Sequence, residues 1–168
     1  RGGGQSVGCL GVASEGVLPS GSFLAGINAL GGFAARPDFS AGVAPRLLGR
    51  MAQGLDKAPL TVVNDFRARC GAAALPDGVL LDVAALKNGL ALLREGDARA
   101  SLARMGARVA VLASEDDPIV PQAMSVASLP ASLSPVWATG GHLLPQTAPD
   151  ACAAFVSQCR QTMREMRP

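Results

Sequence analysis

The chain is poor in the side chains with which proteins bind nucleic acids. Its 168 residues include no tyrosine, one tryptophan and five phenylalanines, so few rings are present to stack on bases. Its 15 lysines and arginines are nearly balanced by 13 acidic residues, for a formal net charge of +2. Because proteins that bind a phosphate backbone carry a clear basic patch or excess, we expect no nucleic-acid partner.

Metal-binding and membrane-spanning patterns are also missing. The cysteines, Cys9, Cys70, Cys152 and Cys159, form no CxxC pair and no Cys/His spacing, so we expect neither a metal nor another cofactor. The uncharged stretch over residues 17–35 is interrupted by proline and glycine, which argues against a membrane span. Free thiols in apolar surroundings suit a reducing compartment, so we expect a cytoplasmic protein.

The first residues do not have the pattern of a secretory signal. The chain begins at Arg1 rather than at Met, and no basic segment leads into a compact apolar core. We therefore expect no signal peptide, and we expect the chain to begin inside a longer reading frame.

Hydrophobic patterning predicts one α/β domain, which is the usual content of a chain of this length. Short apolar runs predict strands over residues 23–30, 108–114 and 135–138. Apolar residues at helical spacing predict helices over residues 7–18, 45–55, 62–70, 86–96, 122–128 and 149–166. The helices over 45–55 and 62–70 form a predicted αα-hairpin, and the alternation of strands and helices after residue 107 predicts a parallel sheet.

Two loops after predicted strands carry residues suited to acid–base chemistry. The only histidine, His142, follows a strand and two glycines, and open α/β sheets place their chemistry in such loops. Asp117 follows the preceding strand, where a carboxylate would fix the tautomer of a histidine and stabilise its charged form. Asp116 is the second choice for this role. The alternatives are a structural imidazole and acids that only form a turn.

A candidate nucleophile lies near the amino end. Gly4-Gln5-Ser6-Val7-Gly8 fits the G-x-S-x-G pattern, in which a tight strand-to-helix turn exposes the serine hydroxyl. The order Ser6, Asp117, His142 is also that of a known serine-hydrolase triad. A phosphate-binding loop is the competing interpretation, but no Gly-Lys-Ser/Thr follows the glycines.

Several segments together resemble a known family. They are GFAARPDF at residues 32–39 followed by Gly42-Val43, LKNGLALL at 86–93 followed by Asp97 and Arg99, DPIVP at 117–121, and Gly141-His142 with Pro145. From about residue 6 to residue 161 the chain resembles α/β-hydrolases, among them the pimeloyl-acyl-carrier-protein methyl ester esterases of biotin synthesis. Phe39 stands where that family often has Trp.

The resemblance implies the C-terminal part of an α/β-hydrolase fold, a mostly parallel sheet with a helical lid insertion. Residues 1–35 would form the nucleophile elbow with a helix and a strand of the core. Residues 36–100 would form the lid and its return segment. Residues 101–168 would complete the core with the acid and histidine loops.

The same resemblance implies roles for individual residues. Ser6 would be the nucleophile, His142 the base and Asp117 the orienting acid, while the amide of Val7 would donate to the oxyanion. The implied reaction is hydrolysis of a methyl ester of a pimeloyl-type acyl chain, carried by a small molecule or by an acyl carrier protein. Four further residues would contact the acyl chain or the carrier: Phe33, Arg46, Arg50 and Phe66.

Alternatives to this interpretation stay open. The lid cations could dock an acidic carrier protein or could simply face solvent. Only five residues precede Ser6, whereas the family has about half a sheet there, including the loop that supplies a second oxyanion donor. The chain could therefore be a non-catalytic remnant of such a hydrolase. It could also be a thioesterase, because fold and triad do not fix the substrate.

Overall fold

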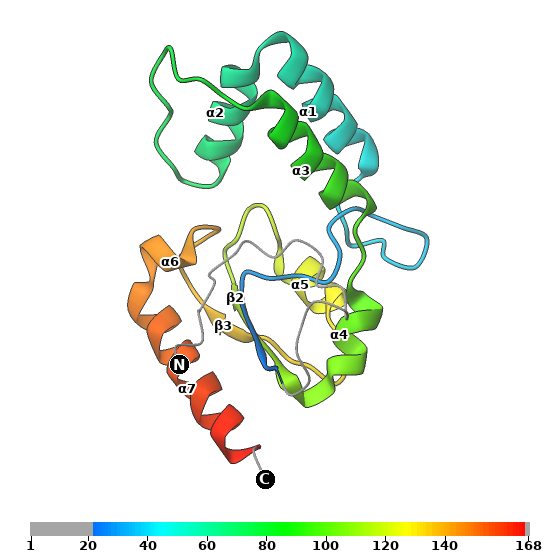
Figure 1. Ribbon diagram of the computed structural model, residues 1–168, viewed down its shortest axis with the longest axis vertical. Helices are drawn as coiled ribbons and strands as arrows, with labels where there is room; N and C mark the ends of the chain where they lie inside the picture. The colour runs from blue at the N-terminus through cyan, green and yellow to red at the C-terminus, as the bar shows by residue number, and fades with distance from the viewer. Residues whose placement is uncertain (1–21, 167–168) are drawn as a thin grey trace.

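The computed structural model describes residues 22–166, which form a mixed α/β fold (Figure 1). Within these residues the sheet has three parallel strands in the order β1 (Leu24–Ile27), β2 (Val109–Ser114) and β3 (Val136–Ala138). The predicted α/β class and parallel sheet are therefore confirmed. The first strand is shorter than predicted because Asn28, with φ of 47°, turns the chain out of the extended conformation.

The helices agree with most of the predicted ones. They are α1 (Pro45–Lys57), α2 (Pro59–Arg69), α3 (Val83–Glu95), α4 (Arg99–Met105), α5 (Gln122–Ser128), α6 (Leu144–Thr147) and α7 (Pro149–Glu165), with a 3₁₀ turn at Gly106–Arg108. The helix predicted over residues 7–18 lies outside the described residues. The short helices α4 and α6 were not predicted, because each buries a single residue and so shows no apolar period. Among the described helices, none has both the length and the apolar composition needed to cross a bilayer.

The two faces of β2 pack against different layers, because successive side chains of a strand alternate between faces. On one face, Val109, Val111 and Ala113 cluster with Leu102 of α4 and with Leu129. On the other face, Leu112 clusters with Leu144 and with Cys152, Phe155 and Cys159 of α7. The central strand is thus covered on both sides, as parallel sheets require.

Helices α1, α2 and α3 are inserted between β1 and β2 and lie together at one end of the molecule (Figure 1). We call residues 45–95 the helical insertion. Helix α1 packs along α3 and buries Leu48 and Leu55. Leu47, which is at helical spacing with these two leucines, has an exposed side chain.

Candidate active site

Three loops meet at the carboxyl edge of the sheet because its strands are parallel and end together. Ile27 of β1 is in register with Leu112, and Ser114 of β2 is in register with Ala138 of β3. Asn28 directly follows β1, the acid loop (residues 115–121) follows β2, and the histidine loop (residues 139–142) follows β3. Residues far apart in the sequence are therefore brought to one edge, where open α/β sheets bind ligands.

Asp117 and His142 are hydrogen-bonded at this edge. The Nδ1 atom of His142 lies 2.9 Å from Oδ2 of Asp117, whose side chain is 1% exposed, while that of His142 is 25% exposed. The other oxygen, Oδ1, accepts the amide of Ile119 at 2.7 Å and that of Val120 at 3.0 Å. Because both oxygens are engaged, the carboxylate is held in one orientation toward the imidazole.

These hydrogen bonds keep Asp117 ionised. Burial raises the pKa of this carboxyl, but the hydrogen bonds from His142 and from the Val120 and Ile119 amides outweigh burial, so the pKa lies below its ordinary value. An ionised carboxylate only accepts hydrogen bonds, so a neutral imidazole keeps its proton on Nδ1 and a free lone pair on Nε2. The pair is therefore suited to accept a proton at Nε2, as a general base does.

Asp116 has a different role, because it binds the backbone of the histidine loop. Its Oδ1 accepts the hydroxyl of Ser114 at 2.7 Å and the amides of Gly140 and Gly141, each at 2.9 Å. These bonds, that of Ser114 first, hold the pKa of Asp116 well below its ordinary value. Gly140 (φ 145°) and Gly141 (φ 70°) adopt backbone conformations that favour glycine, and their consecutive amides converge on the carboxylate.

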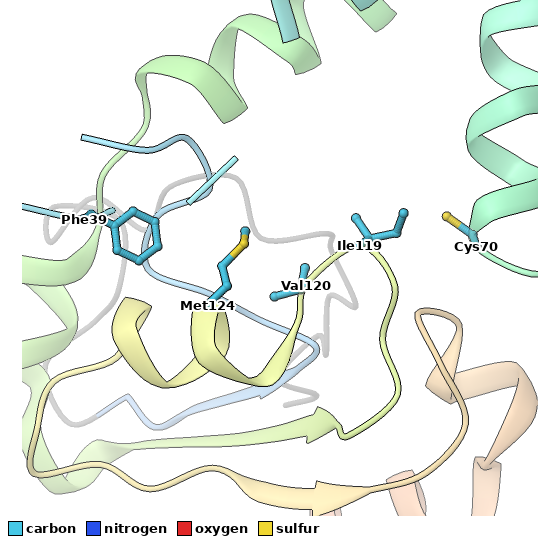
Figure 2. Packing of buried hydrophobic residues seen from close by; sticks show 5 residues of the cluster. All are labelled: Phe39, Cys70, Ile119, Val120 and Met124. Carbon is cyan, nitrogen blue, oxygen red and sulfur yellow. The ribbon is translucent and has the colours of Figure 1, made fainter. Parts of the chain in front are cut away.

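The helical insertion contacts the surroundings of the Asp117–His142 pair at two points. The Phe66 ring of α2 meets the imidazole edge-on, with centroids 6.3 Å apart and planes at 80°. Just beyond α2, Cys70 belongs to a buried apolar cluster with Phe39, Ile119, Val120 and Met124, which we call the bridging cluster (Figure 2). Figure 2 shows Cys70 directed toward Ile119, which lies two residues after Asp117 in the sequence. Burial, and secondarily the charge of Asp117, raise the pKa of the Cys70 thiol.

The structure brings together some of the predicted site residues and not others. Ser6 and Val7 lie outside the described residues. Phe33 packs against the bridging cluster, at the carboxyl edge of the sheet. Arg46 and Arg50 lie on the exposed surface of α1.

Asn28 is the residue that sequence reasoning missed. It contacts groups more than 80 positions away, so no local pattern marks its role. An asparagine directly after an apolar run is the one available signal, since asparagine tolerates a left-handed backbone better than most residues.

No metal cluster competes with this site among residues 22–166, and the cavity next to α7 lies elsewhere. No group of three or more His, Cys, Asp or Glu side chains in this part of the chain is arranged to hold a metal ion. A half-open cavity of about 200 Å³ lies near the amino ends of β2 and β3, between the sheet and α7. Its lining includes Phe23, Val136 and Phe155 but neither Asp117 nor His142, so we do not assign the chemistry to it.

Comparison of the sequence with models of known protein families finds no match, and comparison with curated proteins finds none either. The function proposed below therefore rests on the geometry of the Asp117–His142 pair and on the short motifs that surround it.

Proposed function

We propose that the chain is a serine carboxylesterase in which Ser6, His142 and Asp117 form a catalytic triad. The observation that carries the proposal is the hydrogen bond between Nδ1 of His142 and the buried carboxylate of Asp117 at the carboxyl edge of a parallel sheet. This pairing is what a serine hydroxyl needs to be activated, because it leaves Nε2 as the basic atom.

The proposed reaction has two steps. Nε2 of His142 takes the hydroxyl proton while Oγ of Ser6 bonds to the ester carbonyl carbon, and the amide of Val7 donates to the developing oxyanion. The bond from that carbon to the alkoxy group then breaks, and His142 returns the proton to the leaving alcohol. In the second step His142 takes a proton from water, whose oxygen bonds to the acyl carbon. The bond from that carbon to Oγ of Ser6 then breaks, and His142 returns the proton to Oγ, which releases the acid and restores the free serine.

The surroundings of His142 support an acyl substrate. Phe66 makes a T-shaped ring contact with the imidazole, and the bridging cluster adds apolar surface beside the acid loop. We propose a pimeloyl-type chain ending in a methyl ester, with the carrier protein held by Arg46 and Arg50 on the exposed face of α1. A cytoplasmic location belongs to the same proposal, supported by the free thiols of the three described cysteines.

Hydrolysis of a short p-nitrophenyl ester tests the triad. We expect activity in the wild-type chain, none above background in Ser6→Ala and His142→Gln, and a fall in kcat of about 10³- to 10⁴-fold in Asp117→Asn, which favours the wrong tautomer. Ser157→Ala, at an exposed position on α7, is the matched control and should keep full activity. A wild-type chain without activity, or a Ser6→Ala variant as active as the wild type, would contradict the proposal and favour a non-catalytic remnant.

Two further substrates test the specificity. A carrier-bound methyl ester should be hydrolysed more slowly by Arg46→Glu/Arg50→Glu, whereas the short ester should be unaffected, because charge reversal acts only on docking. Equal loss on both substrates would contradict the docking role. An acyl thioester turned over much faster than the matching methyl ester would reassign the enzyme as a thioesterase.

A further inference from the structure

Asn28 has a strained backbone at the edge of the candidate site. Among residues 22–166 it is the one non-glycine residue with a positive φ, 47°. Left-handed conformations are unfavourable for residues with a side chain, although asparagine tolerates them better than most. Such a conformation persists where surrounding contacts fix it, and it occurs most often at functional sites.

The side chain of Asn28 links the ends of all three strands. Its Oδ1 accepts the amide of Ser114, the last residue of β2, at 2.9 Å. Its Nδ2 donates to the carbonyl of His142 at 2.9 Å and to that of Gly141 at 3.2 Å, beyond the end of β3. The backbone amide of Asn28 also donates to Leu112 of β2 at 2.7 Å. The left-handed turn after β1 thus aims one amide group at both neighbouring loops.

Asp116 binds the backbone N–H groups of the same loop, and Asn28 binds its backbone C=O groups. The carboxylate accepts the amides of Gly140 and Gly141, whereas Asn28 binds the carbonyls of Gly141 and His142. Gly141 is therefore fixed at both its N–H and its C=O. Any shift or rotation of this loop relative to the sheet breaks bonds to at least one of the two side chains.

We infer that Asn28 and Asp116 are positioning residues that clamp the loop over residues 139–142 and so keep the imidazole of His142 against Asp117. Neither side chain is hydrogen-bonded to the imidazole, so both act through the backbone of the loop. As a statement about catalysis the inference rests on the proposed function. Its geometric content, a dependence of the Asp117–His142 hydrogen bond on the clamp, can be tested without substrate.

Nuclear magnetic resonance of the full chain tests the clamp, because its single histidine gives one imidazole signal. In protein labelled with ¹⁵N-histidine, the wild type should show a protected proton on Nδ1. Asn28→Gly allows the left-handed backbone without steric strain and removes the side-chain bonds, and Asp116→Ala removes the carboxylate. In both variants we expect this proton to exchange with solvent at least about tenfold faster, because the hydrogen bond opens more often.

Two control variants separate positioning from general damage. Asp116→Asn keeps an oxygen that can accept the loop amides, so it should restore protection relative to Asp116→Ala. Glu115→Ala changes the exposed neighbour of Asp116 and should leave the exchange rate at the wild-type value. Wild-type exchange in both Asn28→Gly and Asp116→Ala would overturn the inference. If Asn28→Gly does not fold, Asp116→Ala decides alone, because Asp116 is exposed and its removal leaves no buried cavity.

The steady-state kinetics of the short ester distinguish this inference from the proposed function. The clamp predicts a fall in kcat of up to about 10²-fold in Asn28→Gly with little change in KM, because a misplaced base slows chemistry rather than binding. Proton protection that depends on the clamp in a chain without esterase activity would overturn the proposed function and leave the inference standing. Unchanged kcat and unchanged protection in an active enzyme would overturn the inference alone.

Discussion

The sheet core and the helical insertion are held together by different kinds of interaction. In the core, Leu112 and Leu144 are fully buried, and β2 is covered on both faces. In the insertion, α2 and α3 bury no residue completely, and α1 buries Leu48 and Leu55. The core therefore fixes Asp117 and His142, whereas the insertion has fewer apolar contacts of its own and depends more on how its base is attached.

That attachment is a set of charged side chains at the base of the insertion, Arg36, Asp38, Asp97 and Arg99, which we call the polar clasp. Arg99 pairs with Asp97 and with Asp38, each at 2.7 Å, and its guanidinium lies 5.0 Å from the centre of the Phe39 ring. Arg36 donates to the carbonyls of Glu95 at 2.7 Å and Gly96 at 3.0 Å, where α3 ends. The clasp thus joins the segment that leaves the core to the segment that returns.

The largest expected difference between the two regions is in the cost of removing a leucine. Leu112→Ala, in the central strand, should lower the free energy of unfolding by about 2–5 kcal/mol, because it leaves a cavity in a packed core. Leu92→Ala, at a position that is 55% exposed on α3, should change it by less than about 0.5 kcal/mol. Urea denaturation of both variants measures these values, and similar costs at the two positions would remove the contrast.

A smaller effect is expected from breaking the polar clasp. Arg99→Met loses two ion pairs and a cation–π contact at a partly exposed site, so we expect a loss of about 1–2 kcal/mol. Hydrogen exchange should increase in residues 32–43 and in α3 but not in β2. Arg94→Met removes an exposed arginine outside the clasp and is the matched control. Equal increases in β2 and in the insertion would show that the two regions are not held independently.

The smallest expected effect is the contribution of Asp97 to the pH dependence of the unfolding free energy. The hydrogen bond from Arg99 lowers the pKa of Asp97 despite partial burial, so this group contributes stability that is present above the unfolded-state pKa of about 4. That contribution is lost as the pH falls through the folded-state pKa. The difference in unfolding free energy between the wild type and Asp97→Asn should therefore shrink as the pH drops from about 6 toward 3. A difference that stays constant with pH would contradict this role of Asp97. Asp65→Asn, at an exposed position on α2 outside the polar clasp, is the control.

The core is the part of the fold that the sequence predicts well. Strand β2 and helix α5 agree with the predicted ranges because uninterrupted apolar runs and helix-forming segments are local signals. Helix α4 has too few buried positions to show a period, and the orientation of Leu47 depends on which helices pack against α1. Sequence patterns thus fail where tertiary packing decides.

The candidate site also combines features that the sequence predicts with features that depend on tertiary contacts. The meeting of the acid and histidine loops follows from parallel strands ending at one edge, so Asp117 and His142 can be paired from the sequence. Asp117 is also the first choice of the sequence for the partner of His142, and the structure confirms it. The separate role of Asp116 cannot be predicted, because it depends on the direction of its carboxylate toward the Gly140 and Gly141 amides. The contacts of Asn28 span three strand ends and leave no local pattern.

Labelling with a fluorophosphonate tests the central claim most directly, because this reagent phosphonylates a serine only when a positioned base activates its hydroxyl. Mass spectrometry of the labelled chain should find one adduct, on Ser6, and labelling should be lost in Ser6→Ala and strongly slowed in His142→Gln. An adduct on another residue, or labelling of Ser6 that is unaffected by His142→Gln, would contradict the proposal that the Asp117–His142 pair serves as the base.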